Sequence, residues 1–406
     1  REKRHDLGEM LVCVTLGFLC GRTTIRRSLK WCKTHLEELR KHMNLKYGIA
    51  SPSTITRMLN GIDEELALYA FMEWIGEIVE SRNTHLAIDG KALCGATEKT
   101  KGETTPMLLN VVETVRGLIL AQLPVDSKTN EITAIPELLK LLDISGSIVT
   151  IDAVGTQTAI MEQIHEQGGH FVLTVKKNQP EAYEEIHTFM DKLGAEDLKR
   201  KKGEAMDPGM KEFLEKYEEI SQMEKNRDRN EYRTCQICKD ASNLTKSQKE
   251  WPHVQSIGRI KQVRIPKEKD SQGNDVTPSK EEFLEKGSRR IPAPSAGEGA
   301  GKDVQCTALI SDLILTAEEL GSIKRMHWSI ENRLHHVLDD TFREDRSPAK
   351  KSRNNLSLIR KYAYNILRLA MYETGLANIM TEMMDCFCDN AALRERYVFQ
   401  GIASLY

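Results

Sequence analysis

The 406-residue sequence lacks three things: a sizeable net charge, regularly spaced cysteines and a long hydrophobic run. Its formal net charge is -2 and its pI is about 6.7, so any surface for nucleic acid must be local. Nine cysteines without disulfide spacing indicate reduced thiols and a cytoplasmic protein. The apolar run from Met10 to Cys20 is too short to cross a bilayer and has no signal-peptide cleavage site, so we expect a buried helix without membrane association.

The composition is that of a globular protein. Hydrophobic residues make up 40% and charged residues 29% of the chain, and its length predicts more than one structural unit. Basic residues gather locally, and we interpret each group by itself as a solvated surface; the groups are Arg200, Lys201 and Lys202; Arg259, Lys261 and Arg264; and Lys350, Lys351 and Arg353.

Helical spacing of apolar residues marks the first part of the chain, from Asp6 to about Val79. Within it, Ser51 and Pro52 precede a short helical run that carries Arg57. Small helical units of this kind read DNA ends or serve as packing and dimer elements, and the sequence leaves both interpretations open.

The pattern then changes to short apolar runs of strand length. Three of them predict a meander, and two further strands are separated by helices, so these two are expected to pair in parallel. The expected strands are 85–89, 108–114, 118–123, 147–153 and 170–176, and the expected helices are 130–142 and 156–167. This order favours an α/β fold with a ribonuclease-H-like mixed sheet flanked by helices, although other mixed folds produce it too.

Beyond the fifth strand, we expect charged helices, a strand over 257–265 and a flexible loop over 270–301, before helical spacing returns from Ala317 to Tyr372. The predicted division has five parts: 1–83, an N-terminal helical unit and candidate DNA-binding unit; 84–180, the first part of the catalytic core; 181–310, an insertion; 311–375, the helical completion of the core; and 376–406, a C-terminal tail.

Two aspartates stand at the ends of predicted strands. Asp89 ends the first strand and Asp152 lies near the end of the fourth. If these strands lie side by side and parallel, their end residues converge at one edge of the sheet. Two carboxylates there make a hard, oxygen-only site that suits Mg²⁺ or Mn²⁺.

A third carboxylate is expected from the helix that contains Glu331. Trp328 and Leu334 lie three residues on either side of Glu331, so an apolar helix face directs Glu331 toward protein. Phosphoryl transfer needs little beyond in-line geometry and charge neutralisation, and two metal ions about 4 Å apart supply both. The polar residues beyond it include Asp339 and Glu344, which we expect to pair on the surface with Arg333, Arg343 and Arg346, with a role behind the metal ligands as the alternative.

Several segments together resemble the DDE transposases of bacterial insertion sequences, in the H-repeat-associated (ISAs-type) family. The segments are Ile88-Asp-Gly-Lys, Lys128-Thr-Asn-Glu-Ile-Thr-Ala-Ile-Pro-Glu-Leu-Leu, Thr150-Ile-Asp-Ala-Val-Gly-Thr-Gln, Val175-Lys-Lys-Asn-Gln, His327-Trp-Ser-Ile-Glu-Asn and Leu338-Asp-Asp-Thr-Phe-Arg-Glu-Asp. The similarity extends from Arg4 to about Tyr372, and several motifs in order are more specific than any one.

The resemblance implies an enzyme that cleaves DNA strands and transfers them at element ends, with Asp89, Asp152 and Glu331 as catalytic residues and ligands of two Mg²⁺ or Mn²⁺ ions. It implies double-stranded DNA, both element ends and target, as partner, and a homodimer or higher assembly on DNA. The predicted DNA-contacting residues are Lys91, Lys176, Lys177, Asn178, Gln179, Arg57, His327, Trp328, Asn332 and Arg333.

The sequence departs from the family pattern in two places. Cys94 stands where the family usually has an Arg, and His327 replaces the Arg that related enzymes carry four residues before the Glu. Two alternative functions therefore stay open: a metal-dependent nuclease that cuts without joining, and a catalytically silent DNA-binding remnant of an insertion element.

Overall fold

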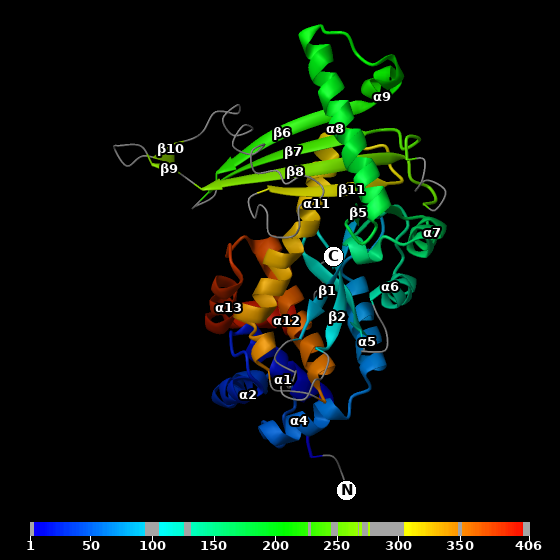
Figure 1. Ribbon diagram of the computed structural model, residues 1–406. Coiled ribbons are helices and arrows are strands. Elements are labelled where there is room, and N and C mark those ends of the chain that lie inside the picture. The colour runs from blue at the N-terminus through cyan, green and yellow to red at the C-terminus, as the bar shows by residue number, and fades with distance from the viewer. Residues whose placement is uncertain are drawn as a thin grey trace. The chain divides into compact units, whose positions relative to one another are not determined.

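A computed structural model describes residues 4–93, 105–125, 131–225, 229–244, 251–266, 268–269, 275–276, 304–347 and 351–400. The chain divides into two compact units (Figure 1). The first unit contains Arg1–Ser145 and Met326–Tyr406, and the second contains Gly146–Arg325. The first unit is therefore discontinuous in sequence, and the second interrupts it.

The first unit begins with the expected helices, namely α1 (Leu7–Leu19), α2 (Ile25–Thr34), α3 (Leu36–Leu39), α4 (Pro52–Asn60) and α5 (Glu64–Gly76). Four of them start where a short polar side chain accepts a hydrogen bond from a free backbone N–H of the first turn; the capping residues are Asp6, Thr24, Ser51 and Asp63. The expected buried helix is confirmed as α1, in which Cys13, Val14 and Leu16 are fully buried.

The expected meander is confirmed in the first unit. Strands β1 (His85–Ala92), β2 (Met107–Glu113) and β3 (Leu118–Val125) pair antiparallel in that order, and Asp89 lies opposite Asn110. Gly117, at a φ of 75°, makes the turn between β2 and β3, where a residue with a side chain would be strained. Helix α6 (Glu131–Lys140) follows the meander.

The rest of the first unit is helical. Helix α11 (Ala317–Ile330) starts in the second unit, and its residues from Met326 onward belong to the first. It leads into two π-helical stretches, η4 (Glu331–His335) and η5 (Val337–Thr341), and a 3₁₀ turn, η6 (Glu344–Arg346). Helix α12 (Arg353–Thr374) contacts β3, α1, α4 and α5 and forms the centre of the unit. The predicted tail contains further helices, α13 (Met380–Asp389), α14 (Ala391–Arg394) and the π-helical η7 (Glu395–Phe399).

The second unit contributes six neighbouring strands of a mixed sheet, in the order β4-β5-β11-β8-β7-β6. Its strands are β4 (Ile148–Ile151), β5 (His170–Val175), β6 (Tyr217–Lys225), β7 (Arg229–Cys238), β8 (Ser256–Pro266) and β11 (Val304–Ser311). The predicted parallel pairing of β4 with β5 is confirmed; it is made through α7 (Thr158–Glu166), and the other pairs are antiparallel. A separate hairpin pairs β9 (Glu268–Lys269) with β10 (Asp275–Val276).

Helices cover both faces of this sheet. Adjacent residues of β8 point to opposite faces: Arg259 hydrogen-bonds the carbonyl of His187 on α8 (Pro180–Lys202), whereas Gly258 lies against Leu320 of α11. Shorter helical pieces follow two of these elements: η2 (Ala153–Gly155) comes after β4, and η3 (Pro208–Met210) and α9 (Lys211–Glu215) come after α8. A mixed sheet flanked by helices is therefore present.

The strand expected over 257–265 is confirmed as β8. Charged helices were expected where β6 and β7 lie, and that prediction is wrong; β11 was not predicted. Most of the loop expected over 270–301 lies outside the described residues, as does Cys94. None of the described helices is long and apolar enough to cross a bilayer.

Candidate active site

Asp89 occupies the second half of β1, where the strand passes from fully buried to partly exposed positions. Its side chain is 27% exposed, and its Oδ2 lies 3.6 Å from Nδ1 of His335. Gly90 follows on the opposite face of the strand, where a side chain would overlap the carboxylate of Glu131. The absence of a Cβ at Gly90 lets α6 approach β1 directly behind Asp89.

His335 presents a neutral imidazole to Asp89. Burial, followed by the charges of Lys91 and Lys361, lowers the pKa of His335 to about 4. The ring is 16% exposed, and its buried Nε2 has no hydrogen-bond partner among the described residues. The Nδ1–Oδ2 separation is longer than a hydrogen bond, so a neutral His335 with its proton on Nδ1 acts on the Asp89 carboxylate as a nearby dipole.

Glu331 is exposed at the start of the π-helical stretch that ends at His335. Residues four apart in a helix lie on nearly the same face, one turn from each other, so the contact of His335 with Asp89 brings the Glu331 turn to the Asp89 side of β1. π-Helical turns are rare and occur frequently at functional sites. Asp89 and Glu331 thus belong to neighbouring parts of one unit.

Lys91 fastens this π-helical region to β1. It lies on the same face of β1 as Asp89, its side chain is 3% exposed, and its ammonium group contacts Asp339. Its Nζ also lies 3.5 Å from Oε2 of Glu344 and 3.7 Å from Oδ1 of Asp345. Burial opposes the charge of Lys91, but the three carboxylates outweigh burial and raise the pKa of Lys91.

The surface pairing expected for Asp339 and Glu344 is wrong. Asp339 pairs with Lys91, and Glu344 is only 4% exposed and lies between Lys91 and Arg360. The spacing of charges along the sequence suggested local partners, whereas the partner of both residues is a lysine on a distant strand. The predicted contact of Lys91 with DNA stays a prediction, and it would require the ammonium group to leave these carboxylates.

A second lysine, Lys361 of α12, is fully buried beneath the meander. Its ammonium group donates to Oδ1 of Asn110, which lies opposite Asp89 in the strand register, and to Oε1 of Gln122. Burial lowers the pKa of Lys361 to about 7, against the opposing effect of Glu344. Charge is therefore concentrated on the side of the meander that α12 covers.

Asp152 belongs to the second unit. It directly follows β4 and precedes the 3₁₀ turn η2, and its side chain is 44% exposed. Its Oδ2 accepts a hydrogen bond of 2.6 Å from Lys176 at the end of the parallel neighbour β5. Burial raises the pKa of Asp152, but Lys176, the backbone N–H of Ala153 and the charge of Lys324 outweigh it, so the pKa lies below its ordinary value and the group is ionised.

Two amides from the turn after β5 hold the segment after β4. Asn178 donates to the carbonyl of Ala153 at 3.2 Å, and Gln179 donates to the carbonyl of Thr156 at 2.6 Å. Parallel neighbours end at the same edge of a sheet, so both turns lie there. The motif Val175-Lys-Lys-Asn-Gln therefore positions Asp152 through its lysine and both amides.

The residues predicted to contact DNA differ in exposure. Lys91 and His327 are buried, and Gln179 and Trp328 are partly buried. The exposed members are Arg57, Lys176, Lys177, Asn178, Asn332 and Arg333.

The donor chemistry of the three predicted carboxylates suits a divalent cation. Among the residues that the structure describes, no three His, Cys, Asp or Glu side chains form a group able to hold a metal ion. Mg²⁺ commonly takes only one or two carboxylates and completes its shell with water and substrate phosphate. Asp89, Asp152 and Glu331 offer hard oxygen donors of this kind.

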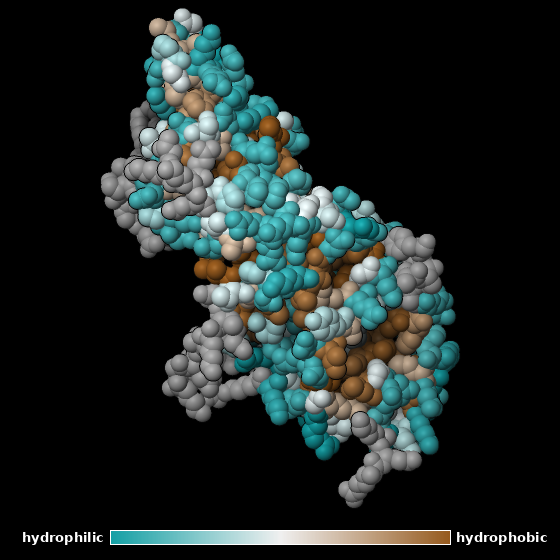
Figure 2. Space-filling view, turned by 90° about the vertical axis from the view of Figure 1, so that its right-hand side faces the viewer, coloured by the Kyte–Doolittle hydropathy of each residue, from teal (hydrophilic) through white to brown (hydrophobic). Residues whose placement is uncertain are grey.

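A cavity of about 380 Å³ in the first unit has different chemistry. Figure 2, which looks onto the side that carries α5, shows apolar side chains gathered in a hollow there. The lining includes Leu68, Leu123 and Leu358, with Glu64, Glu65 and Glu137 among its polar members. Three carboxylates repel phosphate groups, so this cavity is not a candidate DNA site.

Sequence reasoning missed His335, Lys361 and Asn110 as neighbours of Asp89. For His335 a signal existed, because it lies one helical turn after Glu331 and shares its face. For Lys361 and Asn110 no local signal existed, since the two are far apart in sequence and meet only through the packing of α12 on the meander.

The fold and these acidic groups define a class of protein. It is a mixed α/β protein with one candidate carboxylate within a strand, Asp89, and another directly after a strand, Asp152. Comparison with known proteins gives the family. The chain belongs to the family described as the transposase DDE domain, whose model matches residues 80–366. A second model, described as DDE_Tnp_1-associated, matches residues 1–75.

Its relatives include two proteins of Escherichia coli (strain K12). The "Putative protein YbfL" is 28% identical over 368 residues, which cover 89% of this chain and 85% of that protein. The "H repeat-associated putative transposase YhhI" is 27% identical over 368 residues, with the same two coverages. The H-repeat-associated resemblance of the sequence is thereby confirmed.

Among solved structures, a piggyBac transposase synaptic complex with hairpin DNA aligns with 98% of this chain and 74% of that chain. The TM-score is 0.40 and the sequence identity 11%, and a likeness at this level carries no conclusion about this chain.

Proposed function

We propose that the protein is an insertion-sequence transposase that cleaves DNA strands at element ends and joins them to a target by metal-dependent phosphoryl transfer. Membership of the transposase DDE domain family supports the substrate and the reaction class. The assignment of residues rests on one observation. The segment that bears Glu331 is held beside Asp89, because His335 contacts Asp89 and Lys91 pairs with Asp339.

In this proposal Asp89, Asp152 and Glu331 are the catalytic carboxylates and the ligands of two Mg²⁺ or Mn²⁺ ions. The bound ions would supply charge neutralisation at the reacting phosphate. The lowered pKa of Asp152 keeps that carboxylate ionised near neutral pH. Lys176 balances the charge of Asp152, and the His335 ring lies beside the Asp89 carboxylate.

The proposed DNA contacts follow from exposure. Lys176 and Lys177 are exposed at the edge of the second unit's sheet, beside Asp152. In this proposal their ammonium groups bind backbone phosphates of a DNA strand whose scissile bond lies at the carboxylates. Asn332 and Arg333 directly follow Glu331 and are also exposed. Arg57 of α4, with Asn178, Gln179, His327 and Trp328, completes the proposed set together with Lys91.

The predicted parts of the chain are given roles in the same way. We assign a ribonuclease-H-like core to 84–180 and 311–375, an insertion to 181–310 and a DNA-contacting role to 1–83. Two element ends must be held at once, so the working assembly on DNA is proposed to be a dimer or larger.

The test uses purified full-length protein, a labelled duplex that carries an element end, and Mg²⁺ or Mn²⁺. We expect cleaved and joined products that disappear with a chelator. Asp89→Asn, Asp152→Asn and Glu331→Gln each remove a charge with little change of shape, and each is expected to abolish cleavage while duplex binding remains. Glu318→Gln, an exposed residue at the other end of α11, is the matched control and is expected to cleave as the unaltered protein does.

Other outcomes separate the alternatives. Cleaved ends without joined products identify a nuclease. Duplex binding without any cleavage under either metal identifies a silent remnant. Full cleavage by any one of the three carboxylate variants overturns the role given to that residue.

A further inference from the structure

Helix α2 is amphipathic, and its polar side carries one sign of charge. Leu29, Trp31 and Cys32 are buried on one side. The exposed side presents four cations, here called the basic face of α2: Arg26, Arg27, Lys30 and Lys33. Three of these, at spacings of four and three residues, share one helix face, and the helix contains no acidic residue.

The orientation of α2 is fixed by close packing. A Cβ on Gly17 of α1 would overlap Ser28 of α2, so the two helices approach at these small residues. The hydroxyl of Ser28, itself buried, donates to the carbonyl of Arg22 at 2.7 Å. The buried side is thus held against α1, and the basic face stays directed to solvent.

The four cations are not neutralised within the described part of the chain: none of them makes an ion pair with another described residue. The basic end of α8 shows the contrast. There Lys199 pairs with Glu196 at 2.7 Å, and Lys201 pairs with Asp197 at 2.6 Å, as does Arg200. The α8 cations are balanced by carboxylates of their own helix, whereas those of α2 are not.

Unbalanced like charges one turn apart oppose helix formation, so the basic face weakens the helix that carries it. In a chain of net charge -2 such a surface does not follow from a general excess of lysine and arginine. From Arg26 to Lys33 the helix rises about 10 Å, close to the axial rise of three base pairs of duplex DNA. These features favour a polyanion with regularly spaced charges.

We propose that the basic face of α2 binds the phosphate backbone of double-stranded DNA, without reading sequence. The inference rests on the proposed function for the choice of DNA as the polyanion. It adds a contact surface on the N-terminal helical unit, residues 1–83, here called the helical leader. This surface lies on a different helix from Arg57 and away from the candidate carboxylates in sequence.

The experiment measures binding of the full-length protein to a labelled duplex of arbitrary sequence over a range of salt concentrations. The test variant is Arg26→Gln/Arg27→Gln/Lys30→Gln/Lys33→Gln. The matched control is Lys199→Gln/Arg200→Gln/Lys201→Gln/Lys202→Gln, which removes the same number of charges from α8. Circular dichroism and thermal melting check that both proteins fold, and Lys30→Gln/Lys33→Gln serves as a milder second variant.

Each lost phosphate contact is expected to flatten the slope of log K against log salt by about 0.9, and thus by up to about 3.6 for all four. Binding at about 0.1 M salt should weaken at least ~10-fold in the test variant, with slope and affinity retained in the α8 control. A test variant with the slope and affinity of the unaltered protein overturns the inference. So does an equal loss in the α8 control.

The outcomes also separate this inference from the proposed function. If the protein binds duplex through α2 but never cleaves it, the inference stands and the transposase activity fails. If the test variant binds duplex normally but loses binding to vesicles of anionic lipid, the partner is a lipid surface and the inference is overturned.

Discussion

At the scale of single residues, the environment of Asp89 depends on His335 and on Lys91, a lysine of its own strand. His335 contacts the carboxylate itself, and Lys91, two residues along β1, binds Asp339 and Glu344. A buried lysine surrounded by three carboxylates is satisfied only if all of them stay in place, so the pairing fixes the position of the π-helical region relative to β1.

His335→Ala should impair cleavage without impairing DNA binding. The variant leaves Asp89 without its neighbouring imidazole dipole, and loss of such a supporting group typically costs about 10- to 100-fold in activity or metal affinity. Cleavage assayed over a Mn²⁺ titration is the measurement, with a raised half-saturating concentration as the expected sign. A role in stability alone would leave that concentration unchanged.

The neighbouring histidine provides the control for this prediction. His336 is 69% exposed and pairs with Asp340, away from Asp89. His336→Ala should keep both the rate and the metal dependence. Identical behaviour of the two variants would contradict the role assigned to His335.

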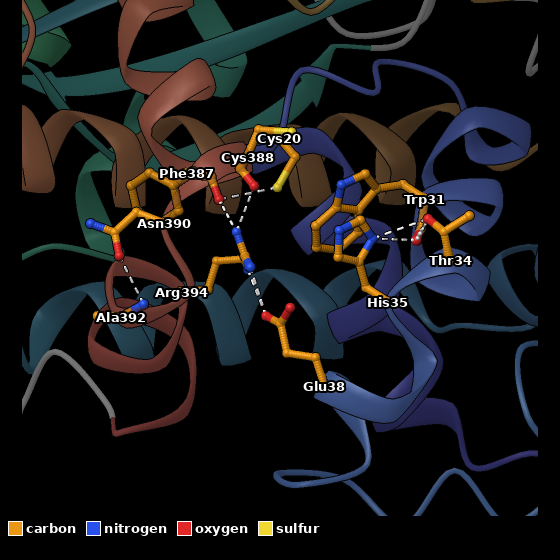
Figure 3. A network of polar contacts seen from close by, with 10 residues as sticks. All are labelled: Cys20, Trp31, Thr34, His35, Glu38, Phe387, Cys388, Asn390, Ala392 and Arg394. Atoms are coloured by element: carbon orange, nitrogen blue, oxygen red, sulfur yellow. Dashed lines mark hydrogen bonds and ion pairs between the residues drawn. The ribbon is translucent and has the colours of Figure 1, made fainter.

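At the scale of elements, the helical leader and the C-terminal helices hold each other. Arg394 of α14 is 4% exposed; it donates to Glu38 at 2.7 Å and to the carbonyls of Phe387 and Cys388. Its guanidinium also lies over the ring of Trp31, 5.4 Å from the centroid. Figure 3 shows this network between α2, α3 and the end of α13. The predicted tail is therefore part of the core of the first unit.

Arg394→Met should lower the free energy of unfolding by about 2 to 4 kcal/mol, because it leaves Glu38 and two carbonyls without their donor. Denaturant unfolding followed by circular dichroism measures the change. Arg396→Met is the matched control: Arg396 is 44% exposed and pairs with Glu373, so its loss should cost less than about 1 kcal/mol. Equal losses of unfolding free energy in the two variants would show that the buried Arg394 network stabilises the protein no more than an exposed ion pair does.

Gly17→Val tests the approach of α1 to α2. A side chain there overlaps Ser28, and overpacking of this kind costs about 1 to 3 kcal/mol or more. Gly76→Ala in α5 is the control, because a Cβ at Gly76 meets no atom within 4 Å, and the change should be neutral or stabilising. Thermal melting of both proteins decides, and an unaltered melting temperature for Gly17→Val would contradict the close packing.

The sequence predicted elements where hydrophobic periodicity was clear, and it failed where charges masked that periodicity. β1 to β5 and α1 were expected because their buried faces are apolar. β6 and β7 were not, because polar residues occupy much of both strands, and several of them, among them Glu231 and Gln236, are buried on the sheet and satisfied by cross-strand partners. Such pairing depends on distant strands and leaves no local pattern.

The same reasoning applies to the candidate site. Asp89 and Asp152 became candidates because each was expected at the end of a strand, and Glu331 because of the resemblance together with its helix. β1 in fact continues past Asp89 to Ala92, since the residues after Asp89 still pair with β2. Lys91 was predicted to contact DNA, and its burial became visible only when β1 and the segment after Glu331 were seen packed together.

At the scale of the whole molecule, buried neutral histidines should make the protein sensitive to acid. Burial lowers the pKa of His85 in the first unit and of His187 in the second to about 4, with Arg259 adding to the effect at His187. The unfolded chain takes up these protons near pH 6.5, before the folded chain does. The free energy of unfolding should therefore fall as the pH drops from about 6.5 toward 4, by about 1 to 3 kcal/mol for each histidine.

Urea unfolding at a series of pH values measures this dependence. The variants His85→Gln and His187→Gln should each flatten the curve between pH 6.5 and 4, while His42→Gln, at an exposed position, should not. A curve that stays as steep in both variants would rule out these two histidines as its origin.

The discontinuity of the first unit has a consequence for biosynthesis. Residues Arg1–Ser145 leave the ribosome well before their partners from Met326 onward, and all of the second unit is translated in between. At about 5 to 20 residues per second that interval is on the order of 10 to 40 s. During this time the side of α1 that α12 will cover has no partner. The second unit can therefore fold first. The helical leader stays incompletely folded and accessible to chaperones and proteases until the last helices have been synthesised.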